Sequence, residues 1–387
     1  MTLKTLEEDF YGPSLEEYFI NPSEINDCCS GKIVDEIYDK YLSNISELCD
    51  CSQLRSRKRD DGYISDDEDI YIAERTTVVF WDLVTYPIPI PDNLQPYGET
   101  IRSALKQMGT HGAVYIMAYG ENLSHLEDEL NKAGIVYAPE GHREMVLDVV
   151  AFANSTNGDL MVIPKPDPDS EFHRVLKCLE SRHHGLFLVE PPDDEDSAHG
   201  LCLDSVQSIV DCTQGLNGRK PVIRAMRIDY SYTLGDDFME DFSKRIRFVK
   251  GAKAGVFWDA EDFPFPDGWS PDDIYKKIEL AFRADGVEGK ISVWAYVGDR
   301  YGDFLRRKKK TWESSIYFLP ATSDRMLHDI NLWAMDSHVD YPDPAYVILV
   351  SGKVGRDRAF TRSLQALDIR NYSVSLITPP KIAVQSS

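Results

Sequence analysis

The stretch Thr77-Val-Val-Phe-Trp-Asp82 is matched further along the chain by Ala254-Gly-Val-Phe-Trp-Asp259. Each copy leads into a turn that contains two prolines, Tyr86-Pro-Ile-Pro89 and Phe263-Pro-Phe-Pro266. β-Branched and aromatic residues favour a buried strand, and the prolines favour its end. We therefore predict that one unit occurs twice in this chain, and that each copy opens with a buried strand ending in aspartate.

Later landmarks follow in the same order in both copies, as a duplication requires. The segment Ala118-Tyr-Gly-Glu121 corresponds to Ala295-Tyr-Val-Gly-Asp299. A helical segment that opens with Asp148 corresponds to one that opens with Asp329. An acidic residue therefore recurs at three matching places, which indicates that the duplication includes a functional site.

Apolar runs alternate with segments of helical spacing in both copies. This alternation is typical of a parallel sheet with helices on both faces, so the predicted fold class is α/β with two tandem domains. The predicted strands are 77–81, 113–117, 135–137, 160–163, 186–189, 254–257, 291–294, 316–318, 346–350 and 374–377. The predicted helices are 101–108, 123–130, 143–154, 172–180, 272–283, 326–335 and 360–367.

Composition changes along the chain suggest where the domains begin and end. The region before the first copy has a basic and then an acidic tract, and the region between the copies is acidic and broken by prolines at its start. Within that second region, residues 221–226 could add an edge strand. The predicted organisation is a partly helical or disordered extension 1–75, a first domain 76–192, a connector 193–250, a second domain 251–380 and a tail 381–387.

Size and composition favour a soluble protein inside the cell. The chain has 387 residues, 42% of them hydrophobic, and no apolar run long enough to span a bilayer. Its seven cysteines are too scattered for a disulfide framework. The first residues include Glu7 and Glu8 where a secretory signal would be apolar. We expect a cytoplasmic or nuclear location and no membrane partner.

The net charge of −23 opposes binding to nucleic acid, so an RNA partner would need a local basic surface. One basic run is Arg55-Ser-Arg-Lys-Arg59. The other follows Asp299 closely and supplies our candidate RNA-binding residues, Arg306, Arg307, Lys308, Lys309 and Lys310. Alternative explanations for this second run are a charged helix face and a nuclear-import signal.

The repeated acidic residues are predicted to converge where parallel strands end. Two carboxylates about 4 Å apart repel by about 4 kcal/mol at an effective dielectric constant of roughly 20, so a cluster of them favours a bound cation. Oxygen ligands favour Mg²⁺ or Mn²⁺, which could assist the hydrolysis of a phosphodiester. The candidate catalytic residues are Asp82, Glu121, Asp148, Asp169, Asp259, Asp299, Asp329 and Asp357.

The order of these landmarks resembles the NYN domain of the limkain class, within the PIN-like nuclease superfamily. The resemblance rests on Trp-Asp, a proline-containing turn, Ala-Tyr with a nearby acid, and a proline before the helix that carries an aspartate. It covers roughly residues 76–192 and 253–379. It implies a metal-dependent endoribonuclease that acts on single-stranded RNA.

The two copies depart from that family pattern differently. The family commonly has Glu-Asn shortly after Trp-Asp; the second copy has Glu261-Asp262 there, whereas the first has Val84-Thr85. The late Ser-Gly-Asp-x-Asp-Phe pattern is broken in both copies, which displaces the fourth acid. The second copy is therefore the better catalyst candidate. Its candidate metal ligands are Asp259, Glu261, Asp299 and Asp329.

Three other interpretations fit the same residues. Asp148 and Asp329 could be helix caps, and an aspartate after a strand is often a turn residue. The two copies could form a degenerate pair that binds RNA or a protein partner without cleaving it. A phosphatase of the haloacid dehalogenase type would require Asp-x-Asp after the first strand, which Asp82-Leu-Val84 lacks and Asp259-Ala-Glu261 only approximates. Pairing between the copies, or a homodimer, also stays open.

Overall fold

The computed structural model describes two compact units of the chain. The predicted extension up to residue 74, Asp299 and the basic run 306–310 lie outside the described residues. No helix in the described parts is long and apolar enough to cross a membrane. The described residues are 75–88, 94–156, 158–191, 201–221, 242–246, 252–265, 268–284, 286–287, 289–298, 316–322, 324–337, 339, 345–352 and 357–377.

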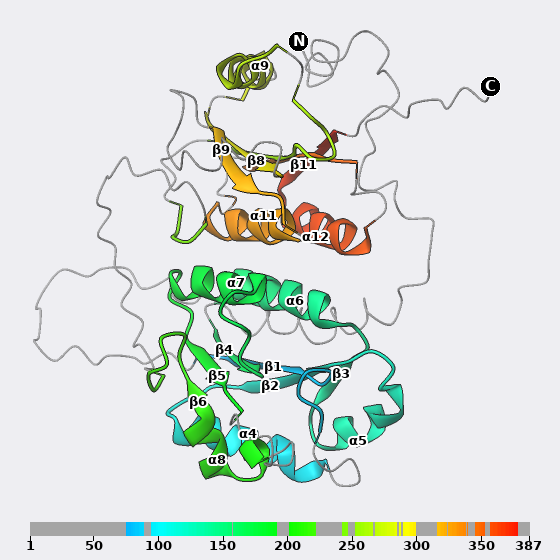
Figure 1. Cartoon of the computed structure of the whole chain (residues 1–387), viewed down its shortest axis with the longest axis vertical. Helices are drawn as coiled ribbons and strands as arrows, with labels where there is room; N and C mark the ends of the chain where they lie inside the picture. The colour runs from blue at the N-terminus through cyan, green and yellow to red at the C-terminus, as the bar shows by residue number, and fades with distance from the viewer. Residues whose placement is uncertain are drawn as a thin grey trace, which may run out of the picture. The chain divides into compact units, whose positions relative to one another are not determined.

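The first unit is a six-stranded sheet with helices on both faces (Figure 1). Its strand order is β3-β2-β1-β4-β5-β6, parallel except for the antiparallel edge strand β6. Helices α6 and α7 cover one face, and α4, α5 and α8 cover the other. The elements are β1 (Thr77–Asp82), α4 (Gln95–Gln107), β2 (Val114–Tyr119), η4 (Ser124–Leu126), α5 (Glu127–Lys132), β3 (Val136–Ala138), α6 (His142–Ser155), β4 (Asp159–Ile163), α7 (Glu171–Glu180), β5 (Leu186–Val189), η5 (Leu201–Leu203), α8 (Val206–Cys212) and β6 (Thr213–Gln214).

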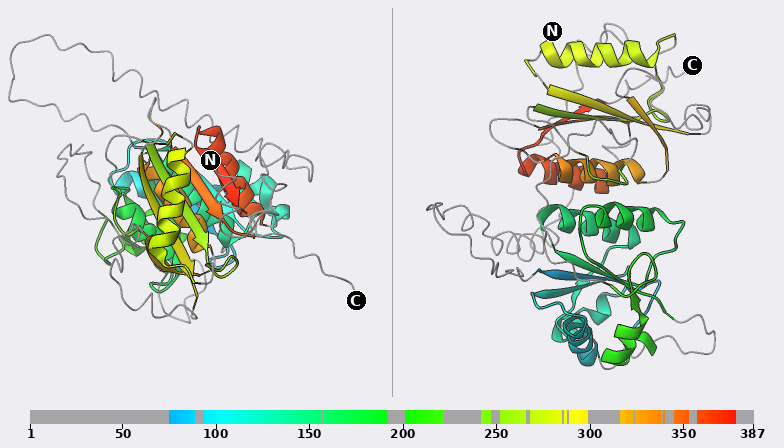
Figure 2. Two further views of the ribbon diagram at one scale, coloured as in Figure 1. Left: turned by 90° about the horizontal axis from the view of Figure 1, so that it is seen from above. Right: turned by 90° about the vertical axis from the view of Figure 1, so that its left-hand side faces the viewer.

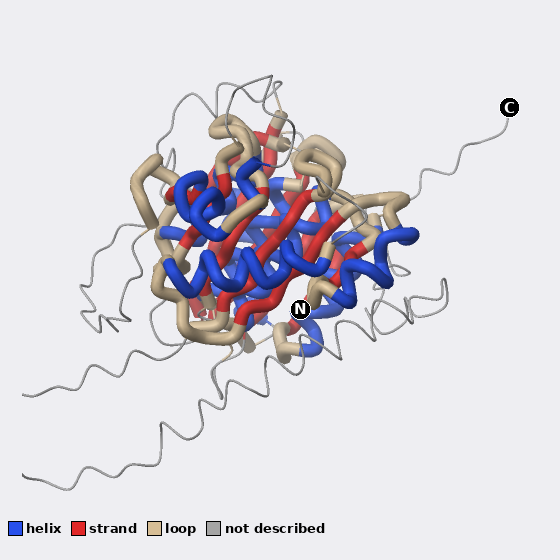
Figure 3. The backbone as a smooth tube through the Cα atoms, turned by 90° about the horizontal axis from the view of Figure 1, so that it is seen from below, coloured by secondary structure: helices blue, strands red, loops and turns tan. Residues whose placement is uncertain are grey.

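The second unit repeats this arrangement with five parallel strands. Its strand order β9-β8-β7-β10-β11 corresponds to β3-β2-β1-β4-β5 of the first unit. Helix α9 covers one face, and α11 and α12 cover the other; the layers are seen edge-on in Figure 2, and Figure 3 distinguishes helices from strands. The elements are β7 (Ala252–Asp259), α9 (Pro271–Ala284), β8 (Gly289–Val297), β9 (Ile316–Pro320), α11 (Arg325–Asp336), β10 (Ala345–Val350), α12 (Arg358–Ile369) and β11 (Ser373–Ile377).

The predicted α/β class is confirmed, and the predicted strands and helices lie within a few residues of the observed ones. One detail is wrong: Asp148 and Asp329 lie inside α6 and α11, which begin at His142 and Arg325. The amphipathic spacing marked these helices correctly, but the polar residues of their first turns concealed where each helix starts.

Part of the predicted connector 193–250 is integrated into the first unit. Cys202, Leu203 and Ile209 are buried in the same hydrophobic cluster as Trp81. The described part of this region supplies an edge strand, β6, which pairs with β5. The predicted segment 221–226 lies outside the described residues except for Pro221.

The end of the connector region packs with the second unit instead. The Ile246 amide donates to Asp336 Oδ2 at 2.8 Å, and the Phe242 ring lies 5.1 Å from that of Trp294. Both rings are almost fully buried. The sequence marked this region as polar and acidic overall, and the few apolar residues that anchor it were too sparse to show a period.

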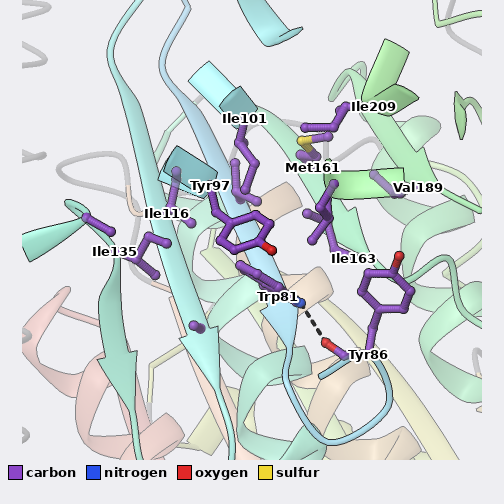
Figure 4. Packing of buried hydrophobic residues seen from close by; sticks show 14 of the residues in the cluster. Trp81, Tyr86, Tyr97, Ile101, Ile116, Ile135, Met161, Ile163, Val189 and Ile209 are labelled. Carbon is purple, nitrogen blue, oxygen red and sulfur yellow. Dashed lines mark hydrogen bonds between the residues drawn. The ribbon is translucent and has the colours of Figure 1, made fainter. Parts of the chain in front are cut away.

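Both copies close the turn after the first strand with the same hydrogen bonds. Trp81 Nε1 donates to the Tyr86 carbonyl at 2.8 Å, as Figure 4 shows, and Trp258 Nε1 donates to the Phe263 carbonyl at 2.6 Å. The amide at the end of each turn also donates to the carbonyl of the aspartate, at 2.9 Å from Tyr86 and 2.8 Å from Phe263. The buried tryptophan therefore fixes the path of the chain around the strand-end aspartate.

We predict that Trp258→Phe destabilises the second unit more than Trp294→Phe does, by about 1–3 kcal/mol. Both substitutions remove similar volume from buried sites in adjacent strands, but only Trp258 donates to a turn carbonyl. Trp294 Nε1 has no hydrogen-bond partner among the described residues. Hydrogen exchange of β7 and β8 in the full chain, followed against denaturant, measures the two losses. Equal losses would show that the indole hydrogen bond contributes nothing.

Candidate active site

The strand-end aspartates of both units hold their own turns. Asp82 Oδ1 accepts from the amides of Val84 and Thr85 at 3.0 and 3.2 Å. Asp259 Oδ1 accepts from the two equivalent amides, those of Glu261 and Asp262, at 3.1 and 3.3 Å. Both aspartates are buried, with 3% and 4% exposure. Each lies at the end of a central strand, beside the point where the strand order reverses, which is where open α/β sheets place their ligand sites.

In the first unit, the second oxygen of Asp82 is also occupied by protein donors. Thr85 Oγ1 donates to Asp82 Oδ2 at 2.8 Å, and His142 Nδ1 lies 3.1 Å from the same oxygen. Burial raises the pKa of Asp82, but the hydrogen bonds from His142, Thr85 and the turn amides outweigh it, so that pKa lies below its ordinary value of 3.8. Two carboxylate oxygens offer about four acceptor positions, and in Asp82 these four bonds use them.

Each unit also pairs the last tyrosine of its second strand with the helical aspartate. Tyr119 Oη donates to Asp148 Oδ2 at 2.9 Å, and Tyr296 Oη donates to Asp329 Oδ2 at 3.0 Å. In the second unit Arg325 Nε lies 3.5 Å from the same oxygen, and Asp329 is fully buried. The interpretation of Asp148 and Asp329 as helix caps is therefore wrong; the residues at the N-cap positions are Gly141 and Asp324.

The remaining candidate acids have local roles or are exposed. Asp357 is the N-cap of α12, and its Oδ1 accepts from the amides of Ala359 and Phe360 at 2.9 and 3.5 Å. Asp169 is exposed, and its amide donates to Asp167 in the turn before α7. Glu121 is exposed just after β2. Asp357, Asp169 and Glu121 stay predictions from the sequence, and no contact places them with the other candidate acids.

Of the described turns after β1 and β7, only the turn after β7 has acidic side chains that bind the ends of the neighbouring strands. Glu261 Oε1 accepts from the Gly298 amide, just past β8, at 2.8 Å. Asp262 Oδ2 accepts from the Gly352 amide, just past β10, at 2.6 Å. The first unit has Val84, which is 66% exposed, at the position of Glu261. The turn after β7 therefore reaches the ends of both neighbouring strands through carboxylates.

Gly298 is the residue that gives the Glu261 carboxylate its space. A Cβ atom added at Gly298 would lie 2.5 Å from Glu261 Oε1 and 2.6 Å from its Cδ. Such contacts are too short to exist, so any side chain at this position would displace the carboxylate. No sequence pattern indicates this role, because a glycine after a strand is most simply a turn residue.

The two units differ in how well their residues fit a divalent cation. Among the described residues, no three acids, histidines or cysteines lie close enough together to hold a metal ion. In the first unit all four predicted acids are described, and Asp82 is saturated by protein donors, so the fit is poor. In the second unit Asp259 and Glu261 supply oxygen donors of the type that Mg²⁺ and Mn²⁺ prefer. Of the two further predicted ligands, Asp329 is fully buried and accepts from Tyr296 Oη, and Asp299 follows Gly298 directly and lies outside the described residues.

Comparison with known protein families matches residues 253–386 to the NYN domain. This match covers the second unit from its first strand, and the α/β architecture agrees with a PIN-like fold. No curated protein matches the chain. A Pseudomonas aeruginosa UCBPP-PA14 crystal structure, assigned as a universal stress protein, is 11% identical over 79% of this chain and 94% of that chain, with a TM-score of 0.20. That score is too low to carry any argument about fold or function.

We predict that Asp82→Asn flattens the acid dependence of the stability of the first unit. Because folding lowers the pKa of Asp82, its ionised form stabilises the fold above about pH 4, and this stabilisation is lost as the pH falls through the folded-state pKa. Hydrogen exchange of β1 and α6, corrected for the intrinsic effect of pH, measures the change. Asp169→Asn, at an exposed turn position, is the control and should leave the profile as in the parent. A parent profile that is already flat at acid pH would contradict the prediction.

Proposed function

We propose that the second unit is an endoribonuclease domain that uses Mg²⁺ or Mn²⁺, and that the first unit is a copy that does not cleave. The NYN match to residues 253–386 supports a nuclease of the PIN-like class, whose members generally act on RNA. The observation that carries the proposal is the Glu261 carboxylate, which the Gly298 amide holds two residues after the buried Asp259. The first unit has no acid at the position of Glu261.

The residues of the second unit would act mainly by orientation. The turn amides hold Asp259 at the end of β7, and the Gly298 amide aims Glu261 across to the end of β8. Tyr296, which pairs with Asp259 across β7 and β8, connects β8 to α11 through its buried bond to Asp329, so Asp329 would act as a positioning residue. Fixed carboxylates at a strand end are preorganised, which reduces the reorganisation that hydrolysis requires.

Asp259 and Glu261, together with Asp299 of the sequence pattern, would hold the cation. When bound, Mg²⁺ or Mn²⁺ supplies positive charge against the phosphodiester and the departing oxygen. The basic run of Arg306, Arg307, Lys308, Lys309 and Lys310 would supply the further positive charge that a chain of net charge −23 needs to approach RNA. Single-stranded RNA is the proposed substrate.

A second candidate function is RNA or protein binding without cleavage. The residues of the first unit support this function for that unit. The hydrogen bonds that saturate Asp82 leave it as a structural residue of its turn. Val84 and Thr85 replace the acids that connect the strand ends in the second unit. A fold can persist in this way after its chemistry is lost. If neither unit cleaves, the same argument extends to the whole chain.

We expect Asp259→Asn and Glu261→Gln each to reduce cleavage of a labelled single-stranded RNA by about 100-fold, because each removes an anionic oxygen donor. Cleavage by the full-length chain is measured with Mg²⁺ or Mn²⁺ and with a chelator. Glu279→Gln is the matched control, since it removes an equal charge from an exposed ion pair with Arg283 on α9. RNA that is bound but left intact under every condition would support the non-cleaving alternative. Cleavage that depends on Asp82 would place the site in the first unit and contradict the proposal.

Gly298→Ala should reduce cleavage with little loss of stability. The added Cβ would meet the end of the Glu261 side chain, which can swing aside at small cost, but the carboxylate would leave its position. Cleavage rate and the thermal midpoint of the full chain, measured together, test this. Gly268→Ala is a control for the loss of a glycine, because nothing lies within 4 Å of its added Cβ, although its positive φ of 79° adds some strain. Full activity in Gly298→Ala would remove Glu261 from the proposed site.

A further inference from the structure

Two cysteines of the first unit lie in direct contact. Cys202, in η5, and Cys212, the last residue of α8, are both free, and their sulfur atoms are 2.6 Å apart. A disulfide bond has a length of about 2.0 Å, so very little movement separates this pair of thiols from a covalent bond. The third described cysteine, Cys178, is buried in α7 and is not in contact with this pair in the hydrogen bonds that the structure shows.

The two thiols differ in their access to solvent. Cys202 is fully buried, whereas Cys212 is partly exposed. Cys212 lines a polar cavity of about 300 Å³, whose wall also includes Glu190, Asp211 and Lys220. Burial and the neighbouring Cys212 thiol raise the pKa of Cys202 to about 12, so Cys202 stays a neutral thiol at physiological pH. Cys212 is therefore the sulfur that a small oxidant can reach first.

The pair is located where a covalent bond would have a structural effect. Cys202 lies in the same hydrophobic cluster as Tyr86, and the Tyr86 carbonyl accepts from Trp81 Nε1 in the turn that follows Asp82. The Glu190 amide, just past β5, donates to the Cys212 carbonyl at 2.9 Å. A bond between the two sulfurs would therefore connect η5 to the end of α8, whose last residue is itself hydrogen-bonded to the residue after β5.

We propose that Cys202 and Cys212 form a reversible, oxidant-sensitive disulfide that closes the segment 202–212 of the first unit into a covalent loop. A hydroperoxide oxidises the Cys212 thiol to a sulfenic acid and is itself reduced to an alcohol or, for hydrogen peroxide, to water. The Cys202 sulfur then attacks the Cys212 sulfur, the S–S bond forms and the S–O bond breaks. The Cys202 proton leaves with the hydroxyl as water. A dithiol reductant restores both thiols and is oxidised to its own disulfide.

This modification does not depend on whether either unit cleaves RNA. It requires only the contact between the sulfurs and the route to Cys212, and both belong to the first unit. A structural zinc site is not supported at this pair, because no third acid, histidine or cysteine among the described residues joins it. Closing the loop between the two cysteines should also stabilise the first unit, by restricting its unfolded state.

The test uses the full chain with Cys28, Cys29, Cys49 and Cys51 replaced by serine, which keeps Cys178, Cys202 and Cys212 as the only cysteines. The folded protein is treated with hydrogen peroxide, alkylated, and digested without reduction. We expect a cross-linked peptide pair containing Cys202 and Cys212, lighter by about 2 Da than the two reduced peptides. Cys178 should stay a free thiol. Dithiothreitol added before alkylation should remove the cross-link, and oxidation should raise the thermal midpoint of the first unit by several degrees.

Cys212→Ser serves as the matched variant, because this side chain is partly exposed and its replacement leaves the core intact. It should abolish both the cross-link and the thermal shift. The proposal is overturned if peroxide leaves Cys202 and Cys212 as thiols, or oxidises Cys212 to sulfinic acid without a cross-link. It is also overturned if the cross-link appears only after the protein has been unfolded.

Discussion

The aspartate that ends the first strand of each sheet accepts hydrogen bonds from the backbone amides of the turn that follows it. In both units one oxygen accepts two amides of that turn, and a buried tryptophan closes the turn with its indole N–H. A buried amide left without its acceptor costs roughly 1–3 kcal/mol and a part-buried one costs less, so replacing either aspartate by a residue without a side-chain oxygen would destabilise its turn. The aspartate is thus retained for structural reasons even where no chemistry follows. Its recurrence in a sequence is weak evidence of catalysis by itself.

The two units differ in the second and third residues after the strand-end aspartate. In the first unit, Thr85 donates its hydroxyl to Asp82, and His142 makes a further hydrogen bond to the same carboxylate. In the second unit, the carboxylates of Glu261 and Asp262 accept instead from amides just past the two neighbouring strands. The same backbone therefore supports a turn whose side chains bind the aspartate in one case, and a turn whose carboxylates bind the neighbouring strand ends in the other. This difference agrees with the NYN match to the second unit.

The sequence was sufficient to predict the strands and the helices of both units, because parallel strands buried on both faces are continuous apolar runs that differ sharply from amphipathic helices. It also located Asp82 and Asp259 at strand ends. It did not reveal that Tyr119 and Tyr296 bind the helical aspartates, although the repeated Ala-Tyr could have suggested it. The contribution of His142, the space left by Gly298 and the contact between Cys202 and Cys212 depend on residues distant in sequence. No local pattern encodes such contacts.

The central claim is that the cation site belongs to the second unit alone, and crystals of the full chain grown with Mn²⁺ test it most directly. The account predicts an anomalous scattering peak beside the carboxylates of Asp259 and Glu261, and no peak at Asp82, whose oxygens are occupied by Val84, Thr85 and His142. A manganese ion bound by Asp82, or the absence of any ion at Asp259 and Glu261 at saturating Mn²⁺, would contradict it.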